Sequence, residues 1–152
     1  MTMQVTVNCA TGGEISAPLD SAAQTALDAA QTAAVTAALL SAPTLAAGDA
    51  AGTSAPAPVL AAGSSDQAGQ YTFGTGAGAT AGAMVVVTFA APRSPHIQVT
   101  GAPLNAATAV LAPYLTQTRD GNGWVTGLIC GFALAPAADQ PADTYAVNYR
   151  AG

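Results

Sequence analysis

The sequence predicts a mainly β protein: a C-terminal antiparallel β-sandwich, jelly-roll-like, preceded by a short hairpin and one alanine-rich helix. Three observations support this fold class. Short apolar runs separated by glycine-rich loops recur from residue 63 to the C-terminus. Helical periodicity is confined to a stretch between residues 21 and 41. The length of 152 residues suits one β-domain with an appendage.

The first 16 residues predict a small hairpin. Met3, Val5 and Val7 alternate with polar residues. A Thr-Gly-Gly turn follows at residues 11–13, and residues 14–16 resume an extended run. Because two isolated strands are only marginally stable in water, we expect this hairpin to pair with a neighbour or to dock on a larger body.

A helix is predicted from about Ala22 to Ser41. Ser21 and Gln24 have the spacing of a capping box, and Pro43 ends the helical pattern. One face carries a seam whose members alternate at spacings of three and four: Leu19, Ala23, Ala26, Ala30, Ala33, Ala37 and Leu40. Alanine permits close helix approach but gains little hydrophobic free energy per turn. A self-associating bundle and a single helix lying on a partner are equally favoured.

Composition divides the chain into three parts. Residues 1–41 form the hairpin and helix, which we interpret as an anchor and oligomerisation unit. Residues 42–62 are rich in Pro, Ala, Gly and Ser, which predicts a semi-rigid linker. Residues 63–152 form the predicted sandwich.

The strands of this sandwich are marked by β-type patterns: Gln70–Phe73, Met84–Ala90, His96–Thr100, Val110–Thr118 around Pro113, Trp124–Phe132 and Tyr145–Arg150. Residues 120–123, Asp-Gly-Asn-Gly, give the clearest turn and predict a hairpin between the fourth and fifth of these strands. About half of the hydrophobic fraction of 51% is alanine, which predicts a thin core of small side chains. A thin core favours burial of further surface between subunits.

Charge excludes several functions. The chain has a net charge of −5, no lysine, and only Arg93, Arg119 and Arg150 as cations. Nucleic-acid binding needs clustered Lys or Arg, so we expect none. The lack of lysine also excludes a phosphate-loop lysine and Schiff-base chemistry.

No catalytic or metal-binding residues are predicted, no cofactor is implied, and we expect a protein that is not an enzyme. His96 is the only histidine, so a site that needs two is excluded. Residues 120–123 resemble the opening of a calcium loop, but the glutamate that should follow is missing, which favours a plain turn. The glycines of residues 74–82 do not have the spacing of a dinucleotide-binding loop.

The two cysteines, Cys9 and Cys130, are interpreted as unpaired, buried or half-buried thiols. The N-terminus shows no secretory signal, so synthesis in a cytoplasm without an export signal is expected. The longest strongly apolar run, Met84–Val87, is too short to span a bilayer, and no membrane insertion is expected.

Four segments carry a resemblance to a known family: GSSDQAG at residues 63–69, a Gly/Thr-rich loop, VVVTFA at 85–90 and PHIQVT at 95–100. Together they resemble the C-terminal head or knob-type β-domain of bacteriophage fibre and virion decoration proteins, over residues 63–152, with a match that fades after Gly101. The resemblance implies a homotrimeric sandwich at the virion surface that touches host-surface glycans. Residues 1–41, whose VNCATGGEI segment resembles anchoring leaders of phage virion proteins, would attach it to a capsid or tail protein of the same particle.

The leading hypothesis is therefore a structural phage virion protein. The alternative is a carbohydrate-binding module or receptor-binding tail protein that contacts host polysaccharide through residues near the 120–123 turn: Tyr114, Arg119, Asn122 and Trp124. Against this alternative, we favour Tyr114 and Trp124 as large core side chains. A glycan hydrolase is the third hypothesis.

Overall fold

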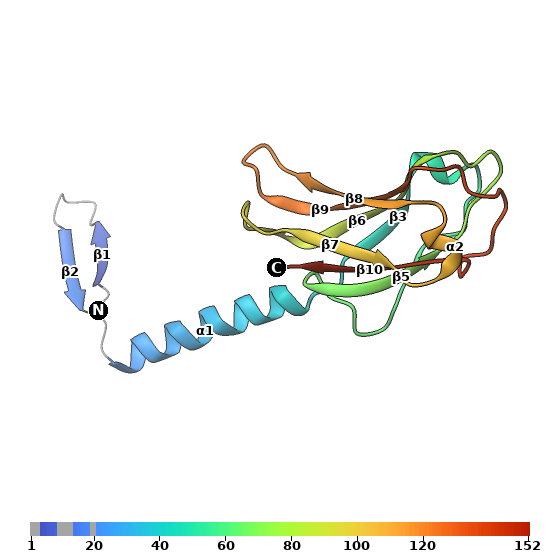
Figure 1. The fold of residues 1–152 in the computed structure, drawn as a ribbon. Helices are drawn as coiled ribbons and strands as arrows, with labels where there is room; N and C mark the ends of the chain where they lie inside the picture. The colour runs from blue at the N-terminus through green and yellow to red at the C-terminus, as the bar shows by residue number, and fades with distance from the viewer. Residues whose placement is uncertain (1–3, 9–13, 19–20) are drawn as a thin grey trace. The chain divides into compact units, whose positions relative to one another are not determined.

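The computed structural model describes residues 4–8, 14–18 and 21–152 (Figure 1). The chain divides into two compact units, one that ends at Ala37 and one that begins at Ala38. In the first unit, β1 (Gln4–Asn8) pairs antiparallel with β2 (Glu14–Pro18), which confirms the predicted hairpin. The predicted turn at residues 11–13 lies outside the described residues.

The helix α1 spans Ser21–Leu40, within one residue of the predicted range at each end. Side chains on its polar face form hydrogen bonds within the helix. The Thr25 hydroxyl donates to the Ser21 carbonyl at 2.8 Å, and the Gln24 amide donates to the Asp28 carboxylate at 3.0 Å. These bonds join residues four apart, the spacing at which side chains face each other on a helix.

The second unit is an antiparallel β-sandwich, as predicted. Its strands are β3 (Thr44–Ala47), β4 (Val59–Leu60), β5 (Ala68–Phe73), β6 (Gly82–Arg93), β7 (Val99–Pro103), β8 (Pro113–Arg119), β9 (Val125–Phe132) and β10 (Tyr145–Ala151). They form two four-stranded sheets, in the orders β4-β5-β10-β7 and β3-β6-β9-β8. Figure 1 shows the sheets as two layers, with β8 and β9 in one and β5 and β10 in the other.

Strict alternation in β10 shows why these residues form a sandwich strand. Tyr145, Val147 and Tyr149 are buried, whereas Asn148 is half-buried and Arg150 is exposed. A strand with one apolar and one polar face suits a sheet that covers a core on one side and faces water on the other. The outer face of this sheet is therefore polar.

Aromatic rings fill the core, so the expectation of a thin core of small side chains is wrong. Phe73 lies 5.5 Å from both Phe132 and Tyr145, measured between ring centroids. Tyr71 and Tyr149 continue this chain of rings, with centroids 6.1 Å apart. Buried aromatic pairs at such distances contribute beyond their buried area. The alanines of this unit lie mostly at the surface, which the overall composition could not show.

The predicted linker, residues 42–62, is part of the sandwich. Strand β3 pairs with β6 from Thr44 opposite Thr88 to Ala47 opposite Val85, and β4 pairs with β5. Ala51, in the 3-10 helix η1 (Asp49–Ala51), is buried in the core. These short edge strands are attached to the sheets by backbone hydrogen bonds. Such bonds do not depend on the side chains, so the sequence of these strands shows no alternation of hydrophobic residues. The prediction of a spacer was wrong for this reason.

Three smaller differences concern residues 96–118. The strand predicted at His96–Thr100 begins at Val99, although Gln98 exchanges two backbone hydrogen bonds with Gly152. The short helix α2 (Ala106–Ala109) lies in a predicted loop and is capped by Asn105, whose side chain accepts from the Thr108 N–H at 2.9 Å. The strand predicted from Val110 starts only at Pro113.

Candidate functional site

The four residues proposed to contact glycans do not form one surface. The hairpin of β8 and β9 is confirmed, and its register places Tyr114 opposite Gly131 but Arg119 opposite Val125. Tyr114 therefore lies near one end of the hairpin, and Asn122 and Trp124 lie at the turn. Five strand residues at about 3.3 Å each place Tyr114 about 17 Å from Arg119 along the strand.

Arg119 is committed to holding the turn. Its guanidinium donates to the carbonyls of Pro95 and Gly123, at 2.9 and 2.7 Å, and to the Gln117 side chain at 2.7 Å. Asp120 supports the same turn, since one carboxylate oxygen accepts from the N–H groups of Asn122 and Trp124, each at 2.9 Å. Both side chains have a structural role here.

Tyr114 and Trp124 are exposed, so the favoured interpretation of both as core side chains is wrong. Their exposed fractions are 42% and 43%. Tyr114 crosses Gly131, where a Cβ atom would collide with the tyrosine ring. Val125, the residue after Trp124, points into the core and is fully buried. Two large aromatics remain at the surface, but at separate places.

The segment at residues 63–69 is a structural joint. Asp66 is fully buried, and its two carboxylate oxygens accept from the N–H groups of Ala90 and Ala91, at 3.0 and 3.2 Å. The Ser64 hydroxyl contacts the backbone of Gln70, where it accepts from the N–H at 3.2 Å. The Tyr149 hydroxyl donates to the Ser65 carbonyl. The GSSDQAG and VVVTFA segments are therefore bonded to each other.

The core favours the neutral forms of the Cys130 thiol and the Tyr149 hydroxyl. Burial raises the pKa of the Cys130 thiol to about 11, and the neighbouring Tyr71 hydroxyl opposes that rise only in part. Burial and the Asp66 carboxylate raise the pKa of Tyr149 to about 12. Cys130 is a free thiol, as predicted, whereas Cys9 lies outside the described residues. A thiol with a raised pKa in an apolar core is a poor nucleophile.

The described residues contain no cluster of three or more His, Cys, Asp or Glu side chains that could hold a metal ion. His96 is exposed. In the part of the chain that the structure covers, no helix has the length and hydropathy needed to cross a membrane.

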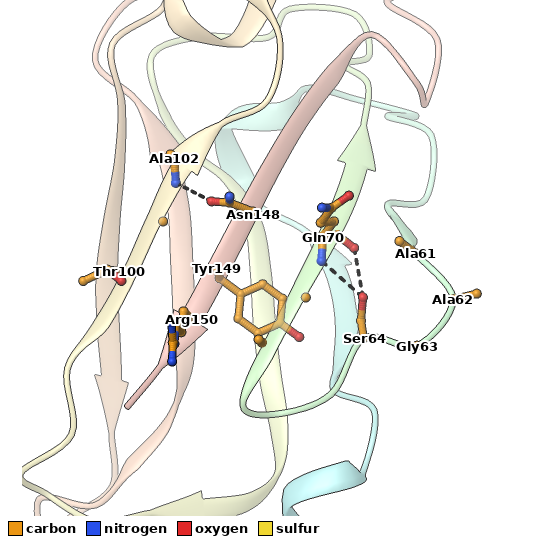
Figure 2. Close-up of a pocket in the computed structure, with 13 residues that line it drawn as sticks. Ala61, Ala62, Gly63, Ser64, Gln70, Thr100, Ala102, Asn148, Tyr149 and Arg150 are labelled. Carbon is orange, nitrogen blue, oxygen red and sulfur yellow. Dashed lines mark hydrogen bonds between the residues drawn. The ribbon is translucent and has the colours of Figure 1, made fainter.

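A hollow of about 710 Å³ lies on the outer face of the β4-β5-β10-β7 sheet (Figure 2). Its floor is formed by outward-facing residues that the register places side by side. Asn148 lies between Gln70 and Ala102, and Arg150 lies between Ala68 and Thr100. The loop of residues 61–64 forms one wall. Alanine and glycine on the floor leave the space open.

The polar side chains of this hollow are largely uncommitted. The side-chain carbonyl oxygen of Asn148 accepts from the Ala102 N–H at 2.7 Å, as Figure 2 shows. The side chains of Gln70, Thr100 and Arg150 form no hydrogen bond or ion pair within the described residues. The lining contains no acidic residue. The sequence analysis missed this site, although the alternation of β10 already indicated that Asn148 and Arg150 share a face.

The seam of α1 is exposed where the structure describes its side chains: Ala23, Ala26, Ala30, Ala33 and Ala37. The side chains of the two leucines at its ends, Leu19 and Leu40, lie outside the described residues. Comparisons with protein-family models, with curated proteins and with solved structures found no match to this chain.

Proposed function

We propose that the chain is a non-enzymatic structural protein of a bacteriophage particle, a homotrimeric fibre or decoration protein. Residues 1–41 attach it to a capsid or tail protein, and the sandwich is displayed at the virion surface. The observation that supports this proposal most is the joint at Asp66. Two of the segments that resemble fibre head domains, residues 63–69 and 85–90, are bonded through this carboxylate. Their shared pattern thus has a structural reason and needs no catalytic one.

The exposed seam of α1 supports the oligomeric part of the proposal. The helix has 20 residues, so the seam extends over about 30 Å at 1.5 Å per residue. Alanines at heptad spacing let helices approach closely, and covering them requires a partner helix or a partner surface. Because alanine contributes little hydrophobic free energy, contacts of the sandwich are expected to add to the association.

Two measurements test this function. Light scattering of the full chain is expected to give three times the chain mass of 14.7 kDa. A monomer at micromolar concentration would contradict the trimer. Mass spectrometry of purified phage particles, encoded by the genome that carries this sequence, is expected to detect the chain in stoichiometric amounts. Its absence from such particles would overturn the virion role even if the protein were trimeric.

A carbohydrate-binding module or receptor-binding tail protein is the second candidate, favoured by the polar hollow on the outer sheet face. We do not extend the proposal to a hydrolase. Most glycosidases use a pair of carboxylates that flank the bond to be cleaved, and the hollow is lined by none. Release of reducing ends from a polysaccharide by the pure protein would support the hydrolase hypothesis instead.

A further inference from the structure

The hollow on the outer face of the β4-β5-β10-β7 sheet has the dimensions of a ligand site. Its volume of about 710 Å³ lies within the range of small-molecule sites, roughly 300–1,000 Å³. It is built on three hydrogen-bonded strands, with a wall supplied by the loop of residues 61–64. That wall is held in place, because the Ser64 hydroxyl accepts from the Gln70 N–H at 3.2 Å. Rigid elements therefore position the groups in the hollow.

The charge of the hollow selects an anionic group. The chain as a whole carries −5, yet the hollow is lined by one cation, Arg150, and by no acidic residue. Arg150 is exposed, and its guanidinium has no hydrogen bond or ion pair within the described residues. Arg119, in contrast, is bound to three acceptors. A guanidinium presents a planar fork of donors that matches one carboxylate.

The remaining polar groups suit a ligand rich in hydroxyls. Gln70, Asn148 and Thr100 lie on three neighbouring strands, which are about 4.8 Å apart, a spacing comparable to one sugar ring. Each can donate and accept hydrogen bonds. Ala68 and Ala102 also lie on the floor of the hollow, and their small side chains leave space for a ligand above the sheet. The hollow lacks the deep apolar pockets that give peptide side chains their specificity, and one cation is too few for a ligand with several phosphates.

We propose that this hollow binds a carboxylate-bearing saccharide, with the carboxylate on Arg150 and the ring hydroxyls on Gln70, Asn148 and Thr100. This site differs from the Tyr114, Arg119, Asn122 and Trp124 set of the sequence analysis. It goes beyond the proposed structural role and does not depend on trimer formation, so a monomer that binds acidic saccharides would contradict only the structural proposal.

The experiment is a glycan array of saccharides that contain uronic or sialic acid, each printed beside its methyl ester, which keeps the ring and removes the charge. The full-length chain is expected to retain acidic members at least tenfold more strongly than their esters. Arg150→Gln is expected to lower this retention about tenfold, which corresponds to about 1.4 kcal/mol, a typical contribution of one charge-assisted bond. Arg150→Lys keeps the charge without the fork and is expected to retain part of the binding.

Two further variants separate the site from the net charge. Ala68→Phe fills the hollow without changing any charge and is expected to abolish retention. Arg119→Gln removes an equal charge at the hairpin turn and is expected to leave it unchanged. Thermal melting of each variant checks that the sandwich remains folded.

Three outcomes would overturn the proposal. The first is no retention of any acidic member above its ester. The second is equal binding by wild type and Ala68→Phe. The third is full competition by acetate at the concentration of the saccharide, which would show a site for a simple carboxylate only.

Loss of binding at high salt is expected, because the contact with Arg150 is exposed to solvent.

Discussion

The helix α1 and the sandwich use alanine in opposite ways. In α1 the described alanines of the seam are exposed. In the sandwich the core is made by Tyr71, Phe73, Phe132 and their neighbours, and alanine lies mostly outside it. The sandwich therefore contains the hydrophobic burial that it needs for its own stability, whereas in the proposed assembly a partner would bury the seam of the first unit.

For the assembly proposed above, this difference indicates which region gains from association. If the sandwich core were thin, oligomerisation would be needed to stabilise the sandwich itself. Because that core is complete, association is expected to serve the N-terminal unit and the arrangement of the heads. Substitutions in the sandwich core should therefore change the free energy of unfolding of the sandwich, whereas substitutions in the seam of α1 should change the molecular mass of the assembly.

The largest effect is expected for Phe73→Ala. Phe73 is buried and contacts the rings of Tyr71, Phe132 and Tyr145. Removing a buried phenyl ring costs about 3–5 kcal/mol. Urea denaturation of the full chain, followed by circular dichroism, should show this loss. Thr32→Ala on the exposed face of α1 is the control and is expected to change the free energy of unfolding by less than about 0.5 kcal/mol. A similar loss of unfolding free energy in both variants would contradict the difference proposed between the sandwich core and α1.

The second effect concerns the joint between residues 63–69 and β6. Asp66→Ala removes both acceptors of the Ala90 and Ala91 N–H groups, and a cost of about 1–3 kcal/mol is expected. Asp66→Asn keeps one acceptor oxygen and should lose less. The control is Asp143→Asn, which removes the same charge from an exposed position. Equal stability of Asp66→Ala and this control, in urea denaturation, would show that the joint is not needed.

The sequence predicted the sandwich and its main strands because their signals are local. Tyr145, Val147 and Tyr149 alternate with polar residues, and the Asp-Gly-Asn-Gly turn joins β8 to β9. The linker at residues 42–62 was predicted wrongly because β3 and β4 are held by backbone hydrogen bonds to distant strands. A short edge strand has no side-chain period that composition could reveal.

The candidate site was less predictable than the fold. Alternation showed that Asn148 and Arg150 share a face, but their neighbours Gln70 and Thr100 come from strands whose order in the sheet is not local. Tyr114 and Trp124 were proposed together because both lie near the 120–123 turn in the sequence. The register of the β8–β9 hairpin separates them. Which side chains meet across a sandwich depends on topology, which the sequence pattern did not give.

A smaller effect is expected for Tyr149→Phe, which removes the hydrogen bond to the Ser65 carbonyl and should cost about 1 kcal/mol. The pH dependence gives a further check. The pKa of Tyr149 is raised to about 12 by burial and by Asp66, above its value of about 10 in the unfolded chain. The neutral hydroxyl is therefore favoured by folding.

The resulting stability is fully present below about pH 10 and is lost as the pH rises towards about 12. Wild type should accordingly lose stability more steeply than Tyr149→Phe across this window, in urea denaturation at a series of pH values. Cys130, whose pKa is raised to about 11, contributes equally to both proteins and cancels in the difference. Parallel pH profiles would contradict the role given to the Tyr149 hydroxyl.

The smallest effect on sandwich unfolding, and the sharpest test of the comparison, is expected for a change in the seam of α1. Ala26→Glu combined with Ala33→Glu places two like charges per helix on the face proposed to associate, and repulsion should separate the subunits. Light scattering should then report a monomer, while the urea midpoint of the sandwich stays unchanged. The matched control, Thr25→Glu with Thr32→Glu, adds the same charge to the polar face and should leave the mass of the assembly unaltered. If both double variants remained trimeric, the seam would not be the contact, and association would have to arise from the sandwich.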